Sequence, residues 1–395
     1  MSRSSNIALP LLFTLLTFID VSTSSSNVFN VVSFGAKPDG VTDSTAAFLK
    51  AWQSACVSAG SATVMVPAGT FLVKGITFTG PCKSKLKFQV AGTVVAPADY
   101  KAFGNSGYWI LFNRVSKMSL VGGTFDARAS GFWACRKSGQ NCPPGVRSIT
   151  FNAATDVIIS GVKSINSQIS HMTLKGCTNV AVRNVKLVAP GNSPNTDGFG
   201  VQSSTGITFT GSTVQSGDDC VSIGPGTRNV LISKLKCGPG HGVSIGSLAK
   251  TLNEDGVENV TLSSSVFTGT QNGVRIKSWA RPSNGFVKNV FFQDLIMKNV
   301  QNPIIIDQNY CPSKEDCPTE QSGVAISQVT YKNIQGTSAT QQAMNLVCSK
   351  TNPCTGITLQ DIKLTYNKGT PATSYCFNAQ GTNLGVIQPT SCLKR

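Results

Sequence analysis

Charged side chains are scarce in this 395-residue sequence, where they make up 13% of the residues, against about a quarter in an average soluble domain. The 34 Lys and Arg still outnumber the 18 Asp and Glu, which gives a formal net charge of +16. The basic residues are scattered and 40% of the chain is hydrophobic, which excludes a disordered basic tail. The 38 Gly and 18 Pro exclude a coiled coil. What remains is a globular chain with a large core and a surface that attracts polyanions.

Histidines and metal-binding cysteine patterns are also rare. The chain has two His and no C-x-x-C segment, so the usual ligand spacing of a zinc site is missing. No apolar stretch after residue 24 approaches the length of a membrane span. Residues 1–24 contain Arg3, an apolar run from Ile7 to Ile19 and then small residues, the order of a secretory signal peptide. We therefore predict a secreted, non-membrane protein with a signal peptide at 1–24 and one domain at 25–395.

All 13 cysteines lie after residue 24, as expected in an oxidising compartment. Most lie near a plausible partner, and the candidate disulfides are Cys56/Cys82, Cys135/Cys142, Cys220/Cys237, Cys311/Cys317, Cys348/Cys354 and Cys376/Cys392. This pairing leaves Cys177 without a partner, and the connectivity stays open at this stage. Asn259-Val260-Thr261 is the only glycosylation sequon, so Asn259 is a candidate for a surface glycan.

Short strand-like runs recur along the chain from about residue 150. Each has a small polar residue or Gly before a β-branched or aromatic run, and the runs start at Asp156, Asn179, Gly206, Asn229, Asn259, Asn289 and Gly356. Their spacing of roughly 23–30 residues, with a longer gap around 300–325, falls in the range of solenoid repeats. Val, Ile, Thr and Phe favour strands, and the Gly, Asn and Ser between them favour turns. We predict an all-β fold, a single-stranded right-handed parallel β-helix.

Helical spacing is nearly absent, with one exception close to the start. Phe48, Ala51, Trp52 and Ala55 form an apolar stripe with period 3.6, preceded by a capping Asp43 or Ser44 and followed by Gly60. We expect this short helix to cap the open end of the solenoid, because an exposed solenoid end needs a cover. A two-sheet sandwich is the alternative fold, but it needs hairpin turns at shorter intervals.

Chemistry-bearing residues recur with the same period. Asp197 and Asp219 are 22 residues apart, and so are Asp219 and His241. In a β-helix with coils near that length, equal offsets stack side chains on rungs about 4.8 Å apart. In Arg275-Ile276-Lys277, strand alternation points both cations to one side and Ile276 to the core. We therefore expect these residues, together with Asp218, to form one outward patch.

Hydrolysis of a glycosidic bond uses this combination of groups, since one carboxyl donates a proton and another carboxylate activates water or attacks. Crowded carboxylates raise one another's proton affinity, and the cations would hold a negatively charged sugar. Each residue also has a plain structural interpretation. One of Asp218 and Asp219 could be structural, because neighbouring strand residues face opposite sides, and three Asp could bind calcium. The equal spacing favours the catalytic interpretation.

Four segments together resemble the signature segments of polygalacturonases, the pectin-cleaving family 28 glycoside hydrolases. They are Asn195-Thr196-Asp197, Gly217-Asp218-Asp219, Gly240-His241-Gly242 and Arg275-Ile276-Lys277. The resemblance covers most of the chain after the signal peptide, and the segments around Gly224-Pro225-Gly226-Thr227 and Ser244–Leu248 look most like plant, pollen-type exo-acting members. It implies a right-handed parallel β-helix and hydrolysis with inversion.

The resemblance also implies a role for each matched residue. Asp218 resembles the general acid, and Asp197 and Asp219 resemble the pair that activates water. His241 resembles the residue that supports protonation of the acid. The substrate-binding residues implied are Asn195, Arg275, Lys277 and Tyr310. His171 matches no motif, and we interpret it as structural or at most lining the cleft.

The expected activity is hydrolysis of α-1,4-galacturonosyl links in de-esterified pectin. We expect the enzyme to release single galacturonate units from the ends of the polymer. An endo-acting enzyme, a calcium-dependent pectate lyase and a noncatalytic pectin-binding wall protein are the alternatives. The expected partner is an acidic polysaccharide. We expect no nucleic-acid or membrane partner, no metal or other cofactor, and a monomer.

Overall fold

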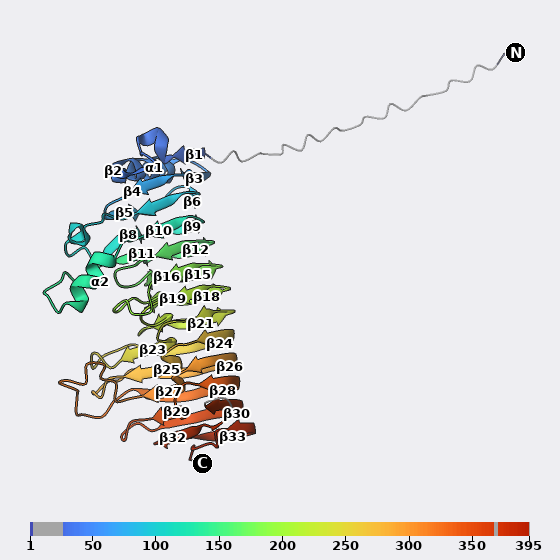
Figure 1. The fold of residues 1–395 in the computed structure, drawn as a ribbon. Coiled ribbons are helices and arrows are strands. Elements are labelled where there is room, and N and C mark those ends of the chain that lie inside the picture. The colour runs from blue at the N-terminus through green and yellow to red at the C-terminus, as the bar shows by residue number, and fades with distance from the viewer. Residues whose placement is uncertain (3–26, 367–369, 395) are drawn as a thin grey trace.

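The computed structural model describes residues 1–2, 27–366 and 370–394, so the expected signal peptide lies almost wholly outside the described residues. The chain winds into one right-handed parallel β-helix, drawn in Figure 1 as a tall stack with the first described coil at the top and the last at the bottom. Because the strands of successive coils pair in parallel, the two-sheet sandwich is excluded.

Two sheets form the walls of the solenoid. Sheet B has eleven strands: β5 (Ile76–Thr79), β8 (Tyr108–Asn113), β11 (Arg147–Asn152), β14 (Met172–Lys175), β17 (Phe199–Gln202), β20 (Val221–Ile223), β23 (Val243–Leu248), β25 (Asn272–Ser278), β27 (Asn302–Asp307), β29 (Gln342–Val347) and β32 (Thr373–Phe377). Sheet A consists of two ladders that the chain visits one after the other in each coil. The first ladder contains β1 (Asn27–Asn30), β3 (Ser61–Val66), β6 (Lys85–Val90), β9 (Ser116–Val121), β12 (Thr155–Ser160), β15 (Thr178–Arg183), β18 (Thr205–Thr210), β21 (Arg228–Ser233), β24 (Val257–Thr268), β26 (Phe286–Val300), β28 (Ala325–Ser338), β30 (Cys354–Tyr366) and β33 (Ala379–Gln388).

The second ladder has shorter strands and leads into the turn before sheet B. It contains β2 (Asp39–Asp43), β4 (Thr70–Leu72), β7 (Thr93–Val95), β10 (Thr124–Asp126), β13 (Lys163–Ile165), β16 (Lys186–Val188), β19 (Thr213–Gln215) and β22 (Lys236–Cys237). From β24 onward, the strands of the first ladder are long enough to run through both ladders of sheet A. A two-residue strand, β31 (Thr370–Pro371), pairs antiparallel with the end of β30.

The core is built from columns of apolar side chains. In the first ladder, Val157, Val180 and Ile207 are direct partners on successive coils, and each is at most 1% exposed. The residue before such a run often adopts a left-handed backbone, as Asn259 (φ 57°) and Asn289 (φ 55°) do, because Asn tolerates that region better than most residues. The recurrent Asn residues of the sequence therefore mark a left-handed position near the start of several strands of the first ladder.

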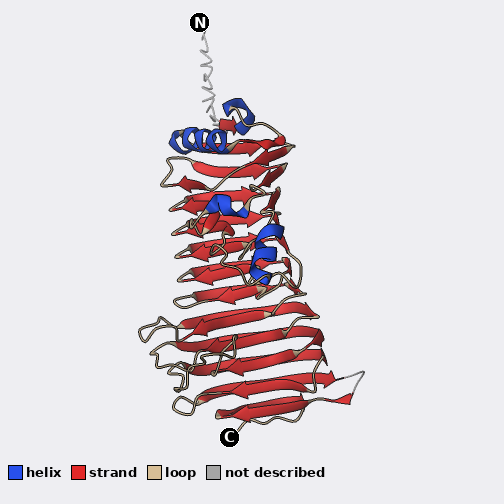
Figure 2. Ribbon diagram, turned by 60° about the vertical axis from the view of Figure 1, so that its left-hand side comes forward, coloured by secondary structure: helices blue, strands red, loops and turns tan. Residues whose placement is uncertain are grey.

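The predicted capping helix is confirmed as α1 (Thr45–Val57), which lies across the top of the stack in Figure 2. The Asp43 carboxylate accepts a hydrogen bond of 2.9 Å from the Thr45 backbone N–H at the first turn. Phe48 and Trp52 are buried against the first coils, and Trp52 Nε1 donates to the Thr79 carbonyl at 3.2 Å. The helix thus supplies the apolar cover that the open end needs.

A second helix, α2 (Ser130–Lys137), corrects the expectation of a single helix. It lies beside the stack in Figure 1, in the insertion between β10 and β11. Phe132 and Trp133 are buried with Ala129 and Ala189 in a small apolar cluster separate from the main core. With only eight residues and its apolar groups side by side, this helix has no long periodic stripe for sequence analysis to detect. Two 3₁₀ segments, η1 (Val31–Phe34) and η2 (Tyr100–Phe103), complete the helical elements of the described chain.

All six candidate cysteine pairs form disulfides in the structure. They are Cys56–Cys82, Cys135–Cys142, Cys220–Cys237, Cys311–Cys317, Cys348–Cys354 and Cys376–Cys392. Cys177 remains a buried free thiol, as the pairing implied. Burial raises the pKa of the Cys177 thiol, which keeps it protonated and unreactive.

The last disulfide lies at the far end of the solenoid from the capping helix. Cys376 belongs to β32 and packs against the apolar core, whereas Cys392 follows β33 and is half-buried in the irregular segment that ends the described chain. Their Cα atoms are 5.3 Å apart, a usual separation for a disulfide. Cys392 is therefore a structural residue of the last coil, and it plays no part in a catalytic site.

The sequon residue Asn259 is exposed, and its Nδ2 donates to Asn229 Oδ1 at 3.0 Å. This bond uses one of the two hydrogens of the side-chain amide, so it leaves the other available for glycosylation. The glycan on Asn259 stays a prediction. Among the described residues, no helix has the length and apolarity to cross a membrane.

His171 is completely buried, in accord with a structural role, and its Nδ1 lies 2.9 Å from Ser164 Oγ. Burial lowers the pKa of His171 to about 3, from an ordinary value of 6.5. As the pH falls below 6.5 the unfolded chain takes up this proton while the folded chain does not, so folding becomes less favourable.

We therefore expect His171 to reduce the free energy of unfolding by about 1.4 kcal/mol per pH unit below about pH 6.5. Denaturant unfolding at pH 6.5 and pH 4.5 measures this effect, and the neutral variant His171→Gln should lose about 2 kcal/mol less than the native chain between these two pH values. Equal slopes in the two proteins would contradict a buried neutral imidazole.

Candidate active site

The predicted site residues lie where the second ladder turns into sheet B. Phe199, Val221 and Val243 are direct partners on β17, β20 and β23. Asp197, Asp219 and His241 each lie two residues earlier in their coils, and the Gly198 N–H donates to the Asp219 carbonyl at 2.8 Å. The 22-residue spacing therefore places these residues on neighbouring rungs, as predicted.

Asp218 and His241 form the outer contact of the site. His241 Nδ1 lies 3.0 Å from Asp218 Oδ1, and the two side chains are 35% and 19% exposed, respectively. The Asp219 backbone N–H donates to the same carboxylate at 2.8 Å, and Asn195 Nδ2 donates to it at 3.4 Å. Asp218 thus faces the solvent, with His241 and Asn195 beside it.

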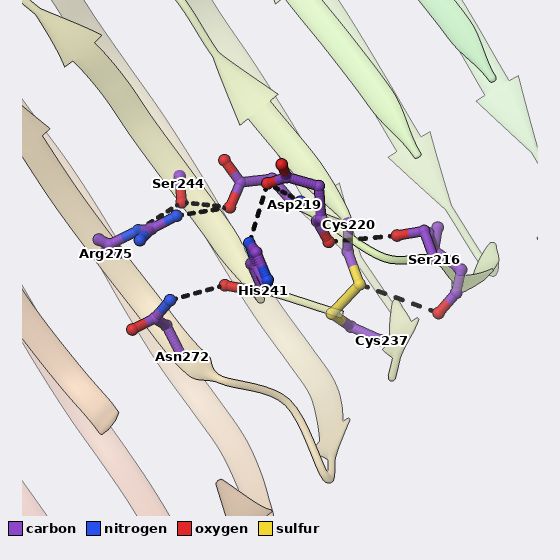
Figure 3. The surroundings of a disulfide bond; sticks show 10 residues. Ser216, Asp219, Cys220, Cys237, His241, Ser244, Asn272 and Arg275 are labelled. Atoms are coloured by element: carbon purple, nitrogen blue, oxygen red, sulfur yellow. Dashed lines mark hydrogen bonds and ion pairs between the residues drawn. A yellow bond between two sulfur atoms is a disulfide. The ribbon is translucent and has the colours of Figure 1, made fainter. Parts of the chain in front are cut away.

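Asp219 turns to the other side and is held by two cations. Arg275 Nη2 lies 2.8 Å from its Oδ1, and Lys277 Nζ lies 2.8 Å from its Oδ2. Ser244 Oγ also donates to Oδ1 at 2.8 Å, and Figure 3 shows Ser244 and Arg275 converging on this carboxylate beside His241. Asp219, Arg275 and Lys277 are only 2–8% exposed. The expected outward patch is corrected on this point, because ion pairing draws these three side chains to the floor of the site.

The floor nevertheless belongs to the outer face of sheet B and not to the apolar interior. Arg275 is the direct partner of Ser244, while Val274 and Ile276 on either side of it are fully buried in the core. The alternation predicted for Arg275-Ile276-Lys277 is therefore confirmed. Tyr310 covers the two cations, with the centre of its ring 5.0 Å from Lys277 Nζ.

Asp197 completes the group of carboxylates. It is half-buried, and Ser222 Oγ donates to its Oδ2 at 3.2 Å. Burial raises the pKa of Asp197 well above its ordinary value, and the negative charges of Asp218 and Asp219 raise it further. Burial also acts to raise the pKa of Asp218, but the hydrogen bond and charge of His241 outweigh it and hold that pKa below its ordinary value. The substrate-free site therefore favours a proton on Asp197.

A divalent cation fits this group poorly. Ligand atoms of Asp218, Asp219 and His241 lie within 4.8 Å of one another, but both carboxylate oxygens of Asp219 already accept from Arg275 and Lys277. A calcium ion would have to displace or oppose two positive side chains, and calcium prefers an all-oxygen shell with excess negative charge. The calcium-cluster interpretation is therefore disfavoured by the local charge.

A hollow of about 840 Å³ runs along sheet B from the site toward the start of the chain. Asp197 and Ser222 line it at the site. Arg147 and Lys175 add positive charge on the earlier coils, whereas Lys250 lines it together with Glu254 and Asp255. The cations over the earlier coils suit an anionic ligand that extends from the site in that direction.

The predicted disulfides differ in their distance from this site. Cys220 directly follows Asp219, so the Cys220–Cys237 bond anchors the turn that carries the acids, and Figure 3 shows it beside His241. Cys376 and Cys392 lie instead in the last coils, beyond the strands β17 to β25 that carry the catalytic candidates. The Cys376–Cys392 bond therefore closes the end of the solenoid and does not belong to the site.

Two serines of the site were not anticipated from the sequence. Ser222 and Ser244 are direct partners on β20 and β23, and they hold Asp197 and Asp219, respectively. Their identical Val-Ser-Ile contexts, again 22 residues apart, were the signal that could have found them. Gly217, the first residue of the Gly217-Asp218-Asp219 segment, has a steric reason to be Gly, since a Cβ there would lie 1.8 Å from the Ser193 carbonyl oxygen. Only Gly therefore lets the acidic turn pass so close to the neighbouring coil.

A solenoid whose open groove gathers carboxylates above a floor of cations defines a glycosidase of the parallel β-helix class. A family model for glycosyl hydrolases family 28 matches residues 56–392. The chain is 49% identical to a polygalacturonase of Prunus persica over 99% of this chain and the whole of that relative. It is 40% identical to an exopolygalacturonase of Platanus acerifolia, covering 93% of this chain and 98% of the relative.

The crystal structure of an endo-xylogalacturonan hydrolase from Aspergillus tubingensis superimposes with a TM-score of 0.79 at 23% identity, covering 91% of this chain and 98% of that one. This likeness concerns the fold. The sequence matches establish the family, and the chain belongs to glycosyl hydrolases family 28.

Proposed function

We propose that this enzyme is a polygalacturonase, which hydrolyses α-1,4-galacturonosyl links in polygalacturonate and de-esterified pectin. The observation that carries the proposal is the convergence of three carboxylates and two cations, Arg275 and Lys277, at a hollow along sheet B. Two carboxyl groups supply the acid and base of glycoside hydrolysis. Arg275, Lys277 and Tyr310 offer the charge and the ring surface that a galacturonate unit needs.

In this proposal Asp218 donates the proton to the leaving oxygen, while Asp197 and Asp219 activate the attacking water. Asp218 suits the donor role because it is the most accessible of the carboxylates that contact His241 or the cations. Its low pKa in the free site opposes a resting proton there. The Nδ1–Oδ1 contact of 3.0 Å gives His241 a direct path for passing a proton to Asp218. A bound galacturonate would add negative charge, which favours that transfer.

Removing His241 should shift the pH profile of the enzyme toward alkali. Its hydrogen bond and charge lower the pKa of Asp218, so His241→Asn should raise that pKa and move the alkaline limb of kcat/KM to higher pH. The value of kcat should fall at the same time, because the proton path is lost. The full pH dependence of kcat/KM on a soluble oligogalacturonate measures both effects, and an unmoved alkaline limb would remove Asp218 from the donor role.

Exo action is the finer proposal, supported by the exopolygalacturonases among the relatives. We expect single galacturonates to be the first product from polygalacturonate, with reducing ends formed while viscosity falls slowly. Chromatographic sizing of early products measures this. Early oligomers with a rapid loss of viscosity would instead establish the endo alternative.

The lyase alternative requires calcium and gives an unsaturated product that absorbs ultraviolet light. We expect full activity in the presence of a chelator and no such absorbance, because the Arg275 and Lys277 side chains already pair with the Asp219 carboxylate. We further propose that the protein is secreted to the cell wall and acts there as a monomer, consistent with its six disulfides.

A further inference from the structure

The segment between residues 157 and 253, which carries the three acids of the site, has few other acidic residues, although Asp156 and Glu254 lie directly beyond its two ends. Between residues 157 and 253 the sequence contains eight basic residues, and its only acidic residues are Asp197, Asp218 and Asp219. All three acids belong to the site described above. Of the eight basic residues, Arg228 is paired with Glu258 from the following coil. The remaining basic charge is therefore not neutralised within this segment.

Three of these cations form a column on the outer face of the second ladder. Lys163 is the direct partner of Lys186, Lys186 of Thr213, and Thr213 of Lys236. All three lysines are exposed. With rungs about 4.8 Å apart, the column spans roughly 14 Å along the solenoid. Arg183, at the corner before β16, is exposed beside it. We call Lys163, Lys186 and Lys236 the lysine column.

The lysine column has no structural compensation in the described chain. Like charges directly opposite each other on neighbouring strands oppose pairing, and none of the three lysines forms an ion pair with a described acidic residue. Asp126 lies on the preceding strand, opposite Ile165, and its Oδ1 accepts from the Arg128 N–H and from Asn166.

The column is separate from the catalytic groove. It lies on the second ladder, whereas the groove follows sheet B, and no lysine of the column lines the 840 Å³ hollow. The two faces meet at the turn that carries Asp197 and Asp218. A long substrate could therefore be held on the second ladder while one of its chain ends, or a neighbouring chain, enters the groove along sheet B.

We propose that the lysine column is a second binding site for an acidic polysaccharide, which holds the enzyme on polymeric polyuronate without taking part in cleavage. The regular positive charges suit a polymer that carries one carboxylate per sugar. Each exposed pair contributes little alone, but several pairs on one polymer act together and raise the effective substrate concentration at the groove. This inference rests on the proposed function, because that function supplies the polyanion.

The test uses the triple variant Lys163→Thr, Lys186→Thr and Lys236→Thr in the full chain. Thr suits these positions because Thr124 and Thr213 already occupy the same column. Binding is measured on immobilised polygalacturonate at low salt, with the groove saturated by free galacturonate. We expect roughly tenfold weaker binding, on the order of three exposed ion pairs. Hydrolysis of a soluble trimer should be unchanged, and hydrolysis of insoluble polygalacturonate should be slower.

The matched control, Lys50→Thr with Lys332→Thr and Lys350→Thr, removes three exposed charges elsewhere. It should bind as the native enzyme does. Equal losses in both triple variants would show that only net charge matters, and undiminished binding in the first would show that the column is unused. Either result overturns the proposal, as does a loss of trimer hydrolysis, because the column would then not be separate from catalysis. A native enzyme that binds the polymer through the column but cleaves no oligomer would refute the proposed function alone.

Discussion

Replacing Asp218 by Asn is expected to lower kcat by about 10²–10⁴-fold, the usual contribution of a positioned general acid, while polygalacturonate is still bound. Asn keeps the shape of the side chain and lacks the transferable proton. Binding should survive because Arg275, Lys277 and Tyr310 remain in place. The fold should survive too, since the charge of Asp218 raises the pKa of Asp197 and its removal relieves that repulsion. Single-turnover rates and retention on polygalacturonate measure the two effects separately.

Asp156→Asn is the matched control, because Asp156 is an exposed carboxylate on β12, outside the groove. It should keep native activity. The pKa directions in the free site make Asp197 the rival proton donor. Substantial activity in Asp218→Asn, combined with its loss in Asp197→Asn, would exchange the two roles.

The second large effect concerns stability. Lys277→Met should lower the free energy of unfolding by about 3–5 kcal/mol, because it removes one partner of a buried ion pair and leaves the Asp219 charge with Arg275 alone. Equilibrium denaturation in urea measures this change. Activity should also fall, since the same ammonium group is placed to hold a galacturonate carboxylate.

The double variant Asp219→Asn with Lys277→Met should be less destabilised than the sum of the single changes, because neither member of the Asp219–Lys277 pair is left charged without the other, although Arg275 loses its carboxylate partner. Lys288→Met provides the control for the substitution itself. Lys288 Nζ lies 2.9 Å from Glu258, but the lysine side chain is 42% exposed, so its loss should cost less than about 1 kcal/mol. Equal effects of the two Lys→Met changes would contradict the view that burial makes the Asp219 pair important.

The stacking of the site was predictable because it depends on one number, the length of a coil. Asp197, Asp219 and His241 are spaced by 22 residues, which is the length of one coil here. Parallel pairing of successive coils therefore places the three residues next to one another. The core columns were predictable for the same reason, since residues such as Val180 and Ile207 recur at matching places in each repeat. Periodic features need no knowledge of side-chain rotamers.

The orientations of Asp218 and Asp219 were not predictable in this way. The two residues are adjacent in a non-repetitive turn, and what separates them is which partner each carboxylate finds, His241 for one and Arg275 with Lys277 for the other. Arg275 comes from a strand 31 residues after Ser244, so the spacing that identifies the acids does not identify this contact. Likewise, α2 lies in a single non-repeated insertion, and a repeat pattern contains no information about it.

The proposed mechanism requires a water molecule between the proton donor and the activating base. This water attacks the anomeric carbon from the side opposite the leaving group, which inverts the configuration. Proton nuclear magnetic resonance of the first galacturonate released from the α-linked polymer tests this directly, before the anomers equilibrate. We predict that the β-anomer appears first. Initial release of the α-anomer would mean a covalent intermediate on one of the three carboxylates and would contradict this account.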